Sequence, residues 1–120
     1  MINLNNLRDN IRVLAEMANG PFLEEEWNID YGSDLNNLLD GDLDGLKKAA
    51  GLLNASLGGK DLIVAQCALL RVQLYAMQIS NSFLNIGDDI EKIFLTKEIK
   101  LPDIPEGYQI PDSYNYKEAV

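Results

Sequence analysis

The 120-residue chain contains no histidine and a single cysteine, Cys67. A disulfide within the chain therefore cannot form, and a zinc site built from Cys and His is excluded. Acid–base or nucleophilic catalysis by histidine is excluded as well. Basic residues are also scarce: 10 Lys and Arg stand against 19 Asp and Glu, a formal net charge of −9. This charge disfavours direct nucleic-acid binding, because phosphates attract cations.

Long apolar runs are scarce as well. The N-terminal segment is amphipathic and lacks the continuous apolar stretch of a signal peptide. The most apolar region, 62–79, is interrupted by Arg71 and three Gln, which are costly in a bilayer. We therefore expect a soluble, cytoplasmic protein without membrane contact. In it, 62–79 is a buried helix and Cys67 is a small core residue.

The apolar share of 47% is ample for a hydrophobic core, and the length suggests one domain. Apolar residues recur at spacings of three and four, and no segment alternates as a strand does. We predict an all-α bundle of four main helices plus a short one. The expected main helices cover 4–18, 43–57, 61–85 and 88 to about 100, and short helices are expected from Pro21 or over 34–39. The breaks lie at Asn19-Gly20-Pro21, 40–45, Gly58-Gly59 and Gly87-Asp88.

The helix at 61–85 is predicted to be long and central. Its polar residues form two narrow stripes about 140° apart around the helix, with apolar residues in the sectors between them. Such a helix is usually packed on two sides. The stripes consist of Gln66, Gln73 and Ser80, and of Arg71, Gln78 and Asn85.

The last segment differs in composition from the rest. Residues 101–120 hold three of the four prolines and three of the five tyrosines, namely Tyr108, Tyr114 and Tyr116. Proline breaks a regular helix. We therefore divide the chain into a helical domain, 1–100, and an extended C-terminal segment, 101–120. This segment either packs on the bundle or trails from it, and a contact with a partner stays open.

One local motif suggests a metal ion. The run Asp40-Gly41-Asp42-Leu43-Asp44-Gly45 matches the first half of an EF-hand loop, which binds Ca²⁺ through alternating carboxylates. The second half does not match, because Gly51 stands where the bidentate Glu should be. We therefore favour the other interpretation, an acidic turn that caps the following helix. We expect no bound metal and no cofactor.

The distribution of charge is the strongest functional signal. Nine acids and no Lys or Arg lie between Val13 and Leu46, so 10 of the 19 acids remain to balance the 10 bases elsewhere. Acids around an aromatic anchor suit a basic protein partner, because charges steer the encounter and aromatics hold the complex. A solvated surface over a core tryptophan is the alternative. The candidate partner-binding residues are Glu24, Glu25, Glu26, Trp27, Asp30, Tyr31, Asp34, Asp40, Asp42 and Asp44.

These observations favour a small acidic, non-enzymatic inhibitor. The hypothesis is an immunity protein that covers the active site of a basic bacterial toxin, such as a nuclease. One alternative is a secretion or assembly chaperone, or a phage-encoded inhibitor that mimics nucleic acid. A second alternative is a calcium-dependent structural module that uses the acids of 40–44.

Overall fold

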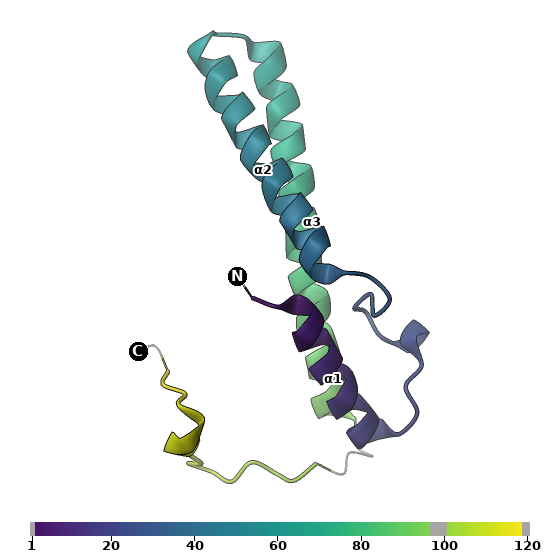
Figure 1. The fold of residues 1–120 in the computed structure, drawn as a ribbon. Helices are drawn as coiled ribbons and strands as arrows, with labels where there is room; N and C mark the ends of the chain where they lie inside the picture. The colour runs from purple at the N-terminus through teal and green to yellow at the C-terminus, as the bar shows by residue number, and fades with distance from the viewer. Residues whose placement is uncertain (1, 97–100, 119–120) are drawn as a thin grey trace.

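The computed structural model describes residues 2–96 and 101–118. The elements are α1 (Leu4–Asn19), η1 (Glu24–Glu26), α2 (Leu35–Gly58), α3 (Leu62–Leu95) and η2 (Asp112–Tyr114). The η elements are single 3-10 turns, and the described residues contain no strand, which confirms the all-α class. α2 and α3 form a long antiparallel hairpin, and α1 lies beside the C-terminal part of α3 (Figure 1).

The helices begin and end where their capping residues predict. The side chains of Asp34 and Asp61 accept hydrogen bonds from the N–H groups of Asn37 and Val64, both at 3.1 Å, at the starts of α2 and α3. α1 ends at Asn19 and is followed by Gly20 with φ of +81°, a conformation that glycine adopts without strain. The predicted boundaries at these points are confirmed.

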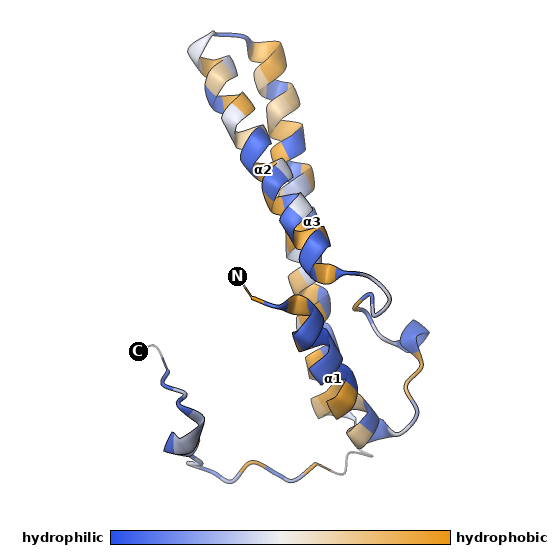
Figure 2. Ribbon diagram, in the orientation of Figure 1, coloured by the Kyte–Doolittle hydropathy of each residue, from blue (hydrophilic) through white to orange (hydrophobic). Residues whose placement is uncertain are grey.

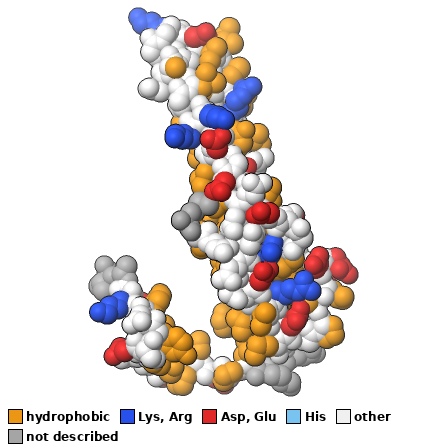
Figure 3. Space-filling view, viewed as in Figure 1, with side chains coloured by type: hydrophobic (Ala, Val, Ile, Leu, Met, Phe, Trp, Pro, Cys, Tyr) orange, Lys and Arg blue, Asp and Glu red, His pale blue; other side chains and the backbone are white. Residues whose placement is uncertain are grey.

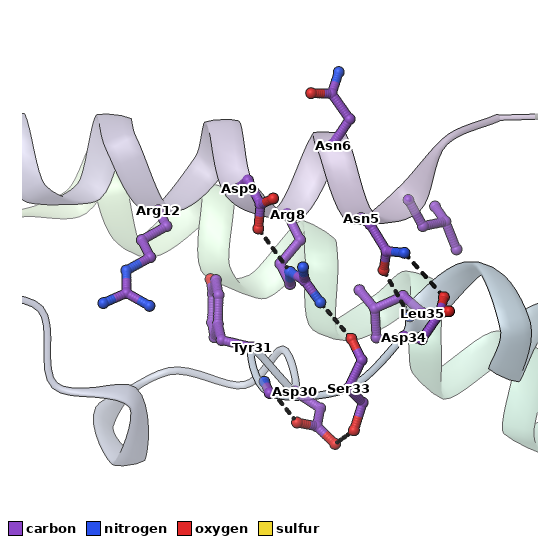
Figure 4. A network of polar contacts seen from close by, with 12 residues as sticks. Asn5, Asn6, Arg8, Asp9, Arg12, Asp30, Tyr31, Ser33, Asp34 and Leu35 are labelled. Carbon is purple, nitrogen blue, oxygen red and sulfur yellow. Dashed lines mark hydrogen bonds and ion pairs between the residues drawn. The ribbon is translucent and has the colours of Figure 1, made fainter.

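Asparagine side chains join the starts of α1 and α2. Asn36 Oδ1 accepts a hydrogen bond from the N–H of Leu4 at 2.6 Å, and Asn5 Oδ1 accepts one from the N–H of Leu35 at 2.7 Å. Asn5 also donates to Asp34 at 2.9 Å (Figure 4). Each helix therefore satisfies a free N–H at the start of the other, which positions α1 against the base of the hairpin.

Two predicted helix breaks are wrong. The run 40–45 lies inside α2, and Gly87-Asp88 lies inside α3, so the described residues form three α-helices instead of the expected four and a short one. A glycine inside a helix costs only about 1 kcal/mol. A continuous helix keeps the apolar residues before and after each predicted break on one buried side. Their burial stabilises the fold by more than the glycine costs. Leu39 and Ala49 are both buried in α2, and Ile93 is buried in α3.

Small residues line the contact between α2 and α3. Gly45 and Ala49 of α2, with Ala65 and Ala68 of α3, let the two helices approach closely. At Gly45 the fit is tight, because a Cβ atom built there would overlap the ring of Tyr75 from α3. The hairpin therefore depends on small side chains as well as on large apolar ones.

The helix at 61–85 was expected to be buried on two sides, and this expectation is wrong. α3 packs on α2 along one side, while its opposite side is open along the hairpin (Figure 2). Cys67 is exposed rather than in the core. The elongated shape, 60 × 37 × 21 Å, leaves nothing within the described chain to cover this side. Exposed large apolar residues of α3 are Leu62, Ile63, Leu69, Leu70, Leu74, Met77, Phe83, Leu84, Phe94 and Leu95.

Length and composition alone would allow α3 to cross a membrane. Its most apolar 18-residue window has a mean hydropathy of 1.5, and α3 is the one helix of the described residues that meets this criterion.

The main core lies where α1, α3 and the segment between α1 and α2 meet. Ile11, Ala15 and Ala18 of α1 face Ile93 of α3 there. Leu101 packs against the edge of this core, and the described residues after it are exposed. The C-terminal segment leads away from the helices in Figure 1. The expected fading of the last helix near Lys100 lies outside the described residues, since α3 ends at Leu95.

The close contact at Gly45 can be tested by adding one methyl group. We expect Gly45→Ala to lower the free energy of unfolding by about 1–3 kcal/mol, because the methyl group overlaps the Tyr75 ring. The matched control is Gly41→Ala, four residues earlier on α2, where nothing lies within 4 Å. There the better helix propensity of alanine should stabilise the protein by about 0.5–1 kcal/mol. Urea unfolding of both variants measures the difference, and equal effects would contradict the close packing.

Candidate interaction surface

A buried carboxylate holds the connector, which we define as residues 20–34 between α1 and α2. Asp89 of α3 is 0% exposed. Its oxygens accept hydrogen bonds from the backbone N–H of Asn28 at 2.8 Å, the N–H of Ile29 at 2.9 Å and the hydroxyl of Tyr31 at 2.8 Å. These three hydrogen bonds offset the free energy that the carboxylate loses when it is removed from water. The connector is therefore pinned to α3 at residues about sixty positions away in sequence.

The sequence around Asp89 predicts the start of a helix and not a buried carboxylate. Asp88 and Glu91 have capping-box spacing, which predicts a helix start at Gly87-Asp88. Because α3 continues through these residues, no helix start exists there to be capped. The sequence gives no signal that Asp89 is buried, because it stands beside other acids such as Asp88 and Glu91. Its burial depends on a backbone segment that only the folded chain brings to it.

Tyr31 belongs to the core and not to the outer surface. It is buried, and its hydroxyl donates to Asp89. Burial raises the pKa of Tyr31 above its usual value near 10, and the hydrogen bond to Asp89 and the charge of Asp89 raise it further. The Tyr31 side chain, a candidate for partner binding, is thus already used inside the molecule.

Trp27 forms part of an aromatic cluster that supports the connector. Its ring stacks on Phe22 with centroids 5.2 Å apart, and Phe22 meets Tyr31 edge-on at 4.8 Å. The Lys92 ammonium lies 4.5 Å from the Trp27 ring centroid, and the Arg12 guanidinium lies 4.9 Å from that of Phe22. Trp27 is half-buried, so one part of it supports the fold while another part reaches the surface.

Three consecutive acids project from this aromatic base. Glu24, Glu25 and Glu26 form η1 and are exposed, and acidic side chains are visible on this connector in Figure 3. Glu24 makes an ion pair with Arg12 at 3.3 Å, while Lys92 Nζ donates to the backbone oxygen of Glu26. Among the described residues, neither Glu25 nor Glu26 forms an ion pair through its carboxylate. The connector therefore presents unpaired negative charge on a fixed backbone.

Asp30 and Asp34 organise the turn into α2. The Ser33 hydroxyl and the N–H of Gly32 donate to Asp30 and lower its pKa, with the hydroxyl as the larger cause. The Asn5 amide and the N–H of Asn37 lower the pKa of Asp34 in the same way. Arg8 closes the turn by donating to the carbonyl oxygen of Ser33, as Figure 4 shows. Both acids are exposed at the surface while their oxygens serve the fold.

The acids of α2 do not share one side of the helix. At 100° per residue, Asp40 and Asp44 lie close together around the helix, and Asp42 points to the other side, where it is half-buried. Asp44 pairs with Lys48 at 2.9 Å. The three carboxylates therefore do not converge as an EF-hand loop requires. The described residues contain no group of three or more acids or thiols placed to hold a metal ion.

The structure thus divides the ten candidate residues. It brings Glu24, Glu25, Glu26 and Trp27 together on the connector and places Tyr31 in the core. Asp30 and Asp34 hold the turn into α2, and Asp40, Asp42 and Asp44 lie within α2 itself. The open side of α3 contains none of the ten candidates, because the sequence pattern predicts that its apolar residues lie in the core. Comparisons with protein-family models, curated proteins and solved structures found no match to this chain.

The Tyr31–Asp89 hydrogen bond predicts a pH dependence. The folded state raises the pKa of Tyr31, so above about pH 10 the unfolded chain releases a proton that the folded chain keeps. The free energy of unfolding should therefore fall as the pH rises above 10. Tyr31→Phe should lower stability by about 1 kcal/mol at pH 7 and reduce this slope. Urea unfolding between pH 8 and 11 measures both effects.

The matched control is Tyr114→Phe, because the Tyr114 side chain is exposed on the C-terminal segment. This variant should retain both the stability and the alkaline slope of the original protein. Identical slopes for Tyr31→Phe and the original protein would contradict the assignment.

Proposed function

We propose that the protein acts by stoichiometric binding of a basic protein through the acidic connector. In its concrete form, the proposal is an immunity protein that covers the active site of a basic bacterial toxin, such as a nuclease. One observation carries it: Glu25 and Glu26 are exposed and lack an ion pair among the described residues, on a backbone held by Asp89. A fixed array of like charge suits fast capture of an opposite surface.

The electrostatics explain why such a binder competes with nucleic acid. A nuclease cleft lined by Lys and Arg attracts phosphates, and the same field attracts carboxylates. The net charge of −9 steers the whole protein toward such a cleft. In this proposal the protein is not an enzyme, needs no cofactor, and acts in the cytoplasm, where a toxin must be neutralised before it acts.

One of the alternatives has a structural observation in its favour. A secretion or assembly chaperone binds apolar segments, and α3 exposes large apolar residues along the hairpin. The calcium-dependent module has no such support, because α2 separates Asp42 from Asp40 and Asp44 around its circumference. Inhibition of a purified basic toxin separates the inhibitor from the chaperone, which would bind an unfolded segment and leave activity unchanged.

The partner test uses the product of the gene directly upstream, where a toxin would be encoded. The proposal expects the two proteins to co-purify and the toxin activity to be lost in the complex. Association should be fast and should slow steeply as salt screens the charges, over a distance of about 8 Å at physiological ionic strength. Neutralising Glu24, Glu25 and Glu26 together to Gln should reduce the association rate by about tenfold or more with little change in dissociation.

The matched control neutralises three exposed acids of the C-terminal segment, Asp103, Glu106 and Asp112, and changes the net charge by the same amount. Stopped-flow or surface-based kinetics should show a smaller effect for this control. Equal slowing by both triple variants would assign the effect to net charge alone and contradict a binding face on the connector.

Trp27 tests whether the aromatic base also contacts the partner. Trp27→Ala should lower the free energy of unfolding by about 2 kcal/mol, because it removes the stack on Phe22. If Trp27 is a hot spot, dissociation should also become about 30-fold faster, which corresponds to about 2 kcal/mol. Trp27→Phe is the control, since it keeps an aromatic ring. An unchanged dissociation rate at a lower melting temperature would make Trp27 purely structural.

A further inference from the structure

The open side of α3 carries a regular pattern of residues, which we call the open seam. Ile63, Leu70, Met77 and Leu84 recur every seven residues. Cys67, Leu74 and Asn81 follow the first three of them by four residues. Together they alternate spacings of four and three, as the a and d positions of a coiled coil do. All seven are exposed, and the five large apolar ones are between 52% and 76% exposed.

The open seam lies almost opposite the contact with α2. α3 meets α2 through residues such as Ala68, Val72 and Ile79, which are buried or half-buried. At 100° per residue, the centre of that contact is about 150° around the helix from the centre of the open seam. α3 thus has two seams at the 3–4 spacing, of which α2 fills one. An isolated helix of this kind leaves its second seam in water.

Polar residues border the open seam at the positions that flank a coiled-coil interface. Both borders repeat every seven residues along α3, at the e and g positions of the heptad. They are the two polar stripes of the sequence, Gln66, Gln73 and Ser80 on one side, and Arg71, Gln78 and Asn85 on the other. The pattern spans 63–84, about 33 Å of helix and about three heptads. Asp88 takes the next a position and ends it.

The near absence of charge on the open seam favours a second copy of the chain as its partner. The seam and its borders carry one charge, Arg71, on a chain whose net charge is −9. A basic partner would find no carboxylate in the seam, and the seam of a second copy would place no like charge opposite its apolar residues. The polar borders also distinguish the seam from a membrane-facing surface, where Arg and Gln are costly.

Asn81 selects the direction of pairing. In a parallel, in-register pair, each seam residue faces its own copy, so Asn81 meets Asn81. Two Asn amides satisfy each other, because each has both donors and an acceptor. In an antiparallel pair with full overlap, Asn81 would face the region of Cys67 and lose this partner. A single Asn at an a position is known to set register and the number of strands.

We propose that two copies of the chain associate through the open seam as a parallel, in-register coiled coil of two α3 helices. α3 then lies between its own α2 and the α3 of the second copy, packed on two sides. Both acidic connectors lie at the same end of this dimer, so it offers two copies of the proposed binding face. The dimer does not depend on the proposed function, because its surface is separate from the connector.

Two leucines of α3 provide a matched test. Leu74 lies in the open seam and is 52% exposed, and Leu69 lies outside it and is 53% exposed. Sedimentation equilibrium should show a dimer for the full chain at micromolar concentration. Leu74→Glu should weaken dimerisation by about 100-fold or more, because two carboxylates would meet in an apolar layer. Leu69→Glu should leave the dimer intact.

Cys67 reports the register directly. In the parallel pair the two Cys67 residues face each other at an a position, within reach of a disulfide. Mild oxidation of the full chain should therefore give a covalent dimer. In the double variant Cys67→Ser/Leu69→Cys the thiol has moved about 160° around the helix, and the covalent dimer should be lost.

Three results would overturn the dimer through the open seam, and a fourth would overturn its parallel register. The first is a chain that stays monomeric in sedimentation equilibrium at 100 times the protein concentration used for the oxidation of Cys67. The second is equal dissociation of the dimer by Leu74→Glu and Leu69→Glu. The third is flotation of the protein with phosphatidylcholine–phosphatidylglycerol vesicles that is lost in Leu74→Glu, which would assign the open seam to a membrane. A dimer without a Cys67 disulfide would reject the parallel register.

Discussion

Three hydrogen bonds to the buried carboxylate of Asp89 fix the path of the connector over α3. A carboxylate without exposure to water is stable only if its oxygens are satisfied, and the connector supplies all three donors. Because two of these donors are backbone N–H groups, the connector has one path across α3. That path places Phe22 and Trp27 against the core and turns η1 outward. Removal of the carboxylate would free the connector, which carries five acids, Glu24, Glu25, Glu26, Asp30 and Asp34.

Two kinds of surface result from this arrangement, and they differ in physical character. The connector carries negative charge that neighbouring Lys and Arg neutralise only in part, through Arg12. The open side of α3 is apolar and almost uncharged. Charge acts over several ångströms and accelerates encounter, while apolar burial acts on contact and sets the lifetime of a complex. This difference in character is why we propose two different partners for the two surfaces, a basic protein for the connector and a second copy of the chain for the open seam.

The narrow contact between α2 and α3 explains why so much apolar surface remains. Gly45, Ala49, Ala65 and Ala68 bring the helices close but bury little area themselves. A hairpin of two helices has one helix–helix interface. α3 has apolar residues on two sides, so one of these sides stays uncovered. The excess is regular in its spacing and bordered by polar residues, which separates it from randomly scattered exposed leucines.

Local signals in the sequence correctly predict the helical class, the caps at Asp34 and Asp61, the end of α1 before Gly20, and the apolar periodicity of α3, because each depends on residues within one or two helical turns. Tertiary structure alone decided that α2 runs through Gly45, that α3 runs through Gly87, and that Asp89 and Tyr31 are buried together. It also decided which side of α3 is covered, where the expectation of two packed sides was wrong. These features depend on contacts between residues far apart in the chain, whose packing energy outweighs a local preference of about 1 kcal/mol.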